Sequence, residues 1–193
     1  ELALRSLRIG PAHDALARAH EAADRARVPA LLAEVAEVRA ALGRPAARRR
    51  SADGEQALRL DEVAALLDSG ALVVDACRRG LSDGAVWRAL ARRPVLFALA
   101  RALAEAWPGD VEREALISHA FHTHRPNETH RARLRVEIGR LRALVAELAR
   151  IEATPRGFVL KPRGAHGVVV LAPPIDGDQA SLVALLSDGA AWS

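Results

Sequence analysis

Lysine and cysteine are almost absent from this sequence. Lysine occurs only at Lys161, so arginine supplies the other 27 of the 28 basic residues. The single cysteine, Cys77, excludes an internal disulfide framework and a zinc site built from several thiolates, and its apolar neighbours predict a small core residue. No apolar run is long enough to span a bilayer, and the first residues do not resemble a signal peptide. We therefore expect a cytoplasmic protein without a membrane partner.

Arginine, in contrast, is abundant. The chain has 193 residues, half of them hydrophobic, which is enough for one ordinary domain or for two small ones, and its formal net charge is +4. The guanidinium group suits phosphates and guanine edges, although a GC-rich genome produces the same arginine-rich composition. The positions of the arginines therefore decide whether they indicate a function.

The sequence divides into four segments. Residues 1–43 predict a helical hairpin, weakly similar to a tetratricopeptide unit, in which Pro29 opens the second helix. Residues 44–56 are polar and predict a linker. Residues 57–163 predict the main domain. Residues 164–193 predict a strand at 168–171 and a helix at 178–186, which could begin a further domain.

The pattern of residues 57–163 predicts an ordered series of elements. These are a short helix to about Leu67, a small antiparallel sheet from 72 to 90 with a turn at Asp83–Gly84, two helices at 94–103 and 111–121, a long helix at 127–150 and a hairpin at 151–160. This order is that of a winged helix, whose third helix contacts DNA and whose hairpin is the wing. We therefore expect a mainly helical α+β fold, in which a helical hairpin precedes a winged helix with a small N-terminal antiparallel sheet and a C-terminal β-hairpin wing.

The long helix has two different faces. At 100° per residue, the apolar residues form one stripe that predicts packing on the other helices: Leu134, Ile138, Leu141, Val145 and Leu148. The opposite face carries small residues: Ala132, Val136, Gly139 and Ala143. Arginines border that small face on both sides: Arg131, Arg135 and Arg142 on one, Arg133 and Arg140 on the other.

A small face bordered by arginines suits insertion into the major groove of double-stranded DNA. Small side chains allow close approach to base edges, arginines reach phosphates or guanine, and Val136 could meet a thymine methyl. Asn127 or Thr129 would cap the helix, His130 would contact a phosphate, and Arg156 in the wing could enter the minor groove. The candidate DNA-binding residues are Thr129, His130, Arg131, Arg133, Arg135, Val136, Arg140, Arg142 and Arg156.

Positive charge is concentrated in the same region. Residues 127–163 contain nine basic and four acidic residues, a net charge of +5, which exceeds the +4 of the whole chain. The alternative is a helix buried on both sides, whose arginines pair with Glu128, Glu137 and Glu147.

Residues 72–160 resemble the winged-helix output domain of bacterial response regulators and related transcription activators. The matching stretches are 111–117 for the second helix, 134–142 for the recognition helix and 151–160 for the wing. The resemblance implies a transcription regulator that binds tandem sites, often as a homodimer, and that contacts RNA polymerase through the loop before the recognition helix. Arg135 and Glu137 depart from the family pattern, so its base preference does not transfer. No phosphoacceptor domain precedes the winged helix, so control by phosphorylation is not implied.

Other functions have weaker support. Four histidines fall within twelve positions and could bind zinc, but their loop contains no cysteine: His119, His122, His124 and His130. No nucleophile elbow or phosphate-binding loop is present, so we expect neither an enzyme nor a cofactor. The rival hypothesis is a protein-interaction scaffold with a degenerate winged helix, in which residues 1–43 bind a partner and the small face of the long helix is a protein interface. A small face covered by residues 1–43 or 165–193 would favour this rival.

Overall fold

The structure, a computed structural model, describes residues 9–51, 54–164 and 166–174. The described residues form six helices: α2 (Ile9–Ala26), α3 (Pro29–Leu42), α4 (Leu60–Leu67), α5 (Pro94–Glu105), α6 (Arg113–Phe121) and α7 (Glu128–Val145). They also form nine strands: β1 (Ala47–Ser51), β2 (Gly54–Leu58), β3 (Leu72–Asp75), β4 (Gly80–Ser82), β5 (Trp87–Ala89), β6 (Asp110–Glu112), β7 (Ala149–Ala153), β8 (Gly157–Pro162) and β9 (Val168–Ala172). The predicted α+β class is confirmed, with more sheet than expected. The helix predicted at 178–186 lies outside the described residues.

Six strands form one mixed sheet in the order β2-β1-β9-β3-β4-β5. Strand β9 is parallel to β3 and antiparallel to β1, and all five of its residues are buried. An apolar strand buried on both faces is typical of the centre of a sheet. The strand predicted near the C-terminus therefore completes the same sheet as β3–β5, although the predicted domain boundary at residue 163 separated them.

The prediction of a linker at 44–56 is wrong, because strands β1 and β2 occupy most of that interval. Glu55 accounts for the difference. Its carboxylate lies 2.8 Å from Arg48 Nη1 and 2.8 Å from Arg50 Nε across the β1–β2 pair. The composition of this segment predicted a solvated run of arginines. Cross-strand pairing neutralises part of its charge instead.

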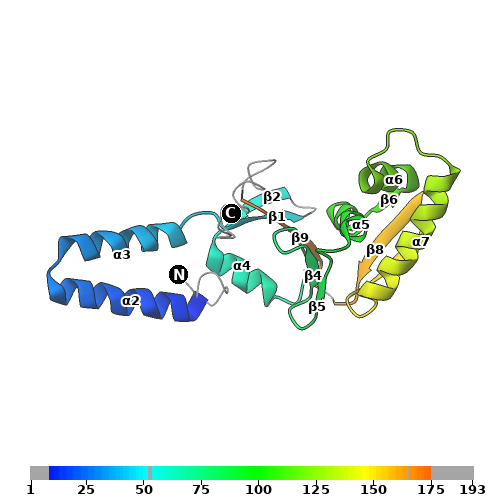
Figure 1. Ribbon diagram of the computed structural model, residues 1–193. Coiled ribbons are helices and arrows are strands. Elements are labelled where there is room, and N and C mark those ends of the chain that lie inside the picture. Colours follow the sequence, from blue (N-terminus) through cyan, green and yellow to red (C-terminus); the bar gives the residue numbers. More distant parts are fainter. Residues whose placement is uncertain (1–8, 52–53, 165, 175–193) are drawn as a thin grey trace.

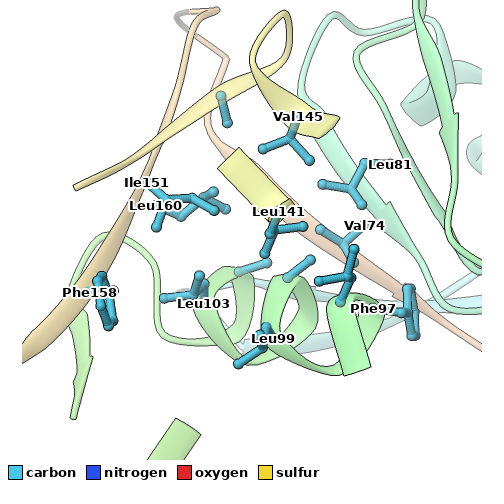
Figure 2. Packing of buried hydrophobic residues seen from close by; sticks show 14 of the residues in the cluster. Val74, Leu81, Phe97, Leu99, Leu103, Leu141, Val145, Ile151, Phe158 and Leu160 are labelled. Atoms are coloured by element: carbon cyan, nitrogen blue, oxygen red, sulfur yellow. The ribbon is translucent and has the colours of Figure 1, made fainter. Parts of the chain in front are cut away.

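A second, smaller sheet has the order β6-β8-β7 and lies beside α5, α6 and α7. Figure 2 shows the shared core, in which Leu141 of α7 lies near Leu103 of α5 and Leu160 of β8. The inward face of α7 is buried as the periodicity predicted. The helix ends at Val145, five residues before the predicted end at Arg150, because strand β7 starts at Ala149.

Helices α2 and α3 form the predicted hairpin, which extends from one end of the molecule while α6 and α7 lie at the other (Figure 1). None of the residues of α3 is buried. Cys77 is exposed in the turn between β3 and β4, so its prediction as a core residue is wrong. Among the described residues, no helix has the length and apolar character needed to cross a membrane.

Candidate nucleic-acid interface

Helix α7 begins with a reciprocal cap. The side-chain oxygen of Asn127 accepts a hydrogen bond from the backbone N–H of His130 at 3.0 Å, and Nδ1 of His130 accepts one from the Asn127 N–H at 3.3 Å. Asn127 is therefore the cap, and Thr129 lies in the first turn. Because Nδ1 accepts this bond, Nε2 is the ring nitrogen that can donate to a phosphate oxygen.

The two faces of α7 differ sharply in exposure. The apolar residues Leu134, Ile138, Leu141 and Val145 are at most 2% exposed. On the opposite face Ala132, Gly139 and Ala143 are exposed, and Val136 is 53% exposed. A Cβ atom built on Gly139 would meet nothing within 4 Å.

Arg131 and Arg135 border the small face on the side of α6. Arg131 Nη2 lies 2.8 Å from the Glu114 carboxylate of α6, and its Nη1 lies 3.5 Å from Glu128. Arg135 Nη2 lies 3.3 Å from the same Glu128. The hydrogen bonds from Arg131 to Glu114 and Glu128 raise the pKa of its guanidinium, which stays charged. Glu114 and Glu128 are both largely exposed.

Arg133 and Arg140 border the opposite side. The guanidinium of Arg133 lies over the ring of Phe121, 4.5 Å from its centroid. Arg140 Nη1 lies 2.9 Å from the carboxylate of Glu137, one turn earlier on α7. The Glu137 side chain is only 13% exposed, whereas that of Arg140 is 64% exposed.

Arg142 has a different position from the other arginines of α7. Its Nε donates to the carbonyl oxygen of Ile151 at 2.7 Å, and its guanidinium lies 5.7 Å from the ring centroid of Phe158. Both partners belong to the β7–β8 hairpin. Of the nine candidate DNA-binding residues, Arg142 is thus the one that connects α7 to the hairpin by direct contacts.

Arg156 lies in the turn between β7 and β8, and its side chain is 67% exposed. Its Nη2 lies 2.6 Å from the Glu112 carboxylate, whose hydrogen bond raises the pKa of the guanidinium. The turn itself is held by Arg113, whose two terminal nitrogens donate to the carbonyl oxygens of Pro155 at 2.8 Å and Thr154 at 2.9 Å. This contact between Arg113 and the turn was not predicted from the sequence. The contact depends on the pairing of β6 with β8, and strand β6 is too short to show a periodicity.

Comparisons with protein families, with curated proteins and with solved structures found no match for this chain. The functional argument therefore depends on the arrangement of the residues themselves.

Two of the alternatives can be compared with these positions. Two of the three glutamates that could pair with the arginines of α7 do so, namely Glu128 and Glu137. Glu147 pairs instead with Arg88 of β5. The small face of α7 is nevertheless exposed, so the helix is not buried on both sides. Within the residues that the structure describes, no three histidine, cysteine or acidic side chains come together as a metal site would require.

Proposed function

We propose that this chain binds double-stranded DNA with sequence preference, using α5, α6, α7 and the β7–β8 hairpin as a winged helix, and that it regulates transcription. In this arrangement α7 lies in the major groove and the turn at Arg156 is the tip of the wing. The order of a strand between the first two helices, a capped third helix and a following hairpin supports this interpretation.

The observation that carries the proposal is the exposed small face of α7. Its 18 residues extend about 27 Å, and B-DNA has a major groove about 12 Å wide that accepts a helix. Ala132, Gly139 and Ala143 add little width to that face. Val136 is the one large hydrophobic residue of α7 that is exposed, and its methyl groups suit contact with a thymine methyl.

The ion pairs around this face do not oppose the proposal. Arg135 and its partner Glu128 are 69% and 72% exposed, and exposed pairs of this kind contribute little to folding. Such an arginine can therefore leave its glutamate for a DNA phosphate. Released counterions then favour the complex at low salt.

Contacts outside the groove-facing surface extend the interface. His130 Nε2 and the first N–H groups of α7 can donate to a backbone phosphate. Arg156 can enter the adjacent minor groove, where the potential is most negative in A·T-rich sequence. Contact with RNA polymerase through residues 122–127 and homodimer formation on tandem sites belong to the same proposal.

Selection of bound duplexes from a random pool tests the proposal directly. We expect enrichment of one sequence, and tighter binding to it than to scrambled DNA in a gel shift at physiological salt. Arg140→Ala should weaken specific binding by ~1–3 kcal/mol, because its side chain is assigned to a base. Arg135→Ala, which removes a phosphate contact, should weaken binding to selected and unrelated DNA alike. Arg25→Ala, in the distant α2–α3 hairpin, is the matched control and should leave binding unchanged.

The scaffold hypothesis predicts the opposite result. If the winged helix were degenerate, the pool would show no enrichment, and replacing Val136 by glutamate would not alter any DNA affinity. Described residues from 14 to 43 and from 166 to 174 leave the small face of α7 exposed, so it is accessible to DNA past these residues.

A further inference from the structure

The four arginines that form ion pairs around the proposed DNA interface differ in how exposed the partner carboxylate is. The carboxylates opposite Arg131, Arg135 and Arg156 belong to side chains that are 56–72% exposed. The carboxylate opposite Arg140 belongs to Glu137, which is only 13% exposed. Three of these arginines therefore have exposed partners, and Arg140 has a largely buried one.

The position of Glu137 explains its low exposure. Its side chain lines a hollow of about 470 Å³ together with Arg140 and the first turn of α5, which includes Pro94, Val95 and Leu96. Helices α5 and α7 pack against each other here, and the partial positive charge at the start of a helix favours a carboxylate nearby. Glu137 thus lies between α7 and the first turn of α5, where its side chain has less room to move than an exposed one.

We propose that Glu137 is a positioning residue that fixes the guanidinium of Arg140 for contact with one base pair, and so sets the sequence preference. This inference rests on the proposed DNA binding. Only Nη1 of Arg140 contacts Glu137, which leaves Nη2 and Nε available as donors. A guanidinium held in advance loses less conformational entropy when it pairs with guanine O6 and N7 than a free one does.

The inference predicts that the substitution Glu137→Gln affects affinity for unrelated DNA and affinity for the selected sequence differently. Glu137→Gln removes a negative charge beside the DNA, so affinity for unrelated DNA should stay the same or increase slightly. Affinity for the selected sequence should fall, because Arg140 is no longer fixed. We expect the ratio of specific to non-specific affinity to decrease about tenfold.

Glu128→Gln is the matched control. It removes the same charge from the same helix, but its carboxylate is exposed and holds arginines assigned to phosphates. We expect it to strengthen binding to selected and unrelated DNA alike, with the ratio unchanged. Thermal unfolding of both variants reports any loss of structure.

A double-mutant cycle separates positioning from direct contact. If Glu137 acts through Arg140, Glu137→Gln should have no further effect on the ratio in an Arg140→Ala background. A full effect in that background would overturn the inference, because Glu137 would then contact a base itself, as an acceptor from a cytosine amino group. An unchanged ratio for Glu137→Gln alone would also overturn it.

A measurement on the unmodified protein does not depend on how the variants fold. The ¹⁵N relaxation of arginine side chains should show Nε–H of Arg140 to be more ordered than that of Arg135 in the absence of DNA. Equal mobility of the two would contradict the inference. Failure of the wild-type chain to select any sequence would instead contradict the proposed function, so the two failures are distinguishable.

Discussion

Gly157 of β8 lies directly against the carbonyl group of Val111 in β6. A Cβ atom built on residue 157 would be 1.7 Å from the Val111 carbonyl oxygen and 2.7 Å from its carbon. Both neighbours are backbone atoms that cannot rotate away. The close approach joins the first strand of the small sheet to the base of the hairpin that carries Arg156.

Gly157→Ala should therefore destabilise the protein by ~2–3 kcal/mol, because β6 and β8 must separate to accept the methyl group. Denaturation in urea measures this loss as a lower free energy of unfolding. An alanine variant as stable as the wild type would contradict the pairing of β6 with β8.

An alanine substitution at Gly139 should change the free energy of unfolding in the opposite direction. It lies in the interior of α7, and an added Cβ would meet nothing within 4 Å. Gly139→Ala should increase the free energy of unfolding by ~0.5–1 kcal/mol, since alanine has the higher helix propensity. The same denaturation experiment measures it.

A larger side chain at the same position tests the groove contact separately. Gly139→Leu should keep the fold, because the position faces solvent, yet weaken DNA binding at least about tenfold by holding α7 away from the base edges. The gel shift is compared with the unfolding curve of the same sample. Wild-type affinity in the folded leucine variant would rule out insertion of this face.

Periodicity was sufficient to predict the helices of the main domain but not the larger sheet. The faces of α7 follow from the 3.6-residue repeat alone, which places Leu134 and Val136 on opposite sides, as the structure has them. Strand β1 pairs with β9 across more than 100 residues, and no local pattern indicates such a partner. Strand β6 has three residues, too few for an alternation to appear.

The candidate site shows the same division between local and tertiary information. The exposure of Gly139 follows from the sequence, whereas the partners of the arginines depend on packing. Arg131 contacts Glu114 of α6, and Arg142 is fastened to the hairpin by the Ile151 carbonyl. Spacing along α7 placed Arg142 beside Arg135, and only the tertiary position of β7 distinguishes them.

Phosphate contacts should be visible in the salt dependence of binding. The logarithm of the binding constant should fall linearly with the logarithm of salt concentration. Arg131→Ala, Arg135→Ala and Arg156→Ala should each lower the magnitude of that slope by about 1, because each removes one cation from the backbone. Arg25→Ala should leave the slope unchanged. A flat response of the wild-type chain would show that these arginines are not at the DNA.

The Cys77 thiol should react slowly although the residue is exposed. Partial desolvation of the sulfur, with the nearby Asp75 carboxylate adding to it, raises its pKa from 9.0 to about 11. At pH 8 the thiolate fraction is thus about 100-fold lower than for an ordinary thiol, and the greater nucleophilicity of the more basic thiolate offsets about tenfold of this. We expect alkylation by iodoacetamide at pH 8 to be about tenfold slower in the folded protein than in guanidinium chloride, with the folded rate still increasing above pH 10. Coincident pH profiles for the folded and unfolded chain would exclude the effect of Asp75 and of desolvation on this thiol.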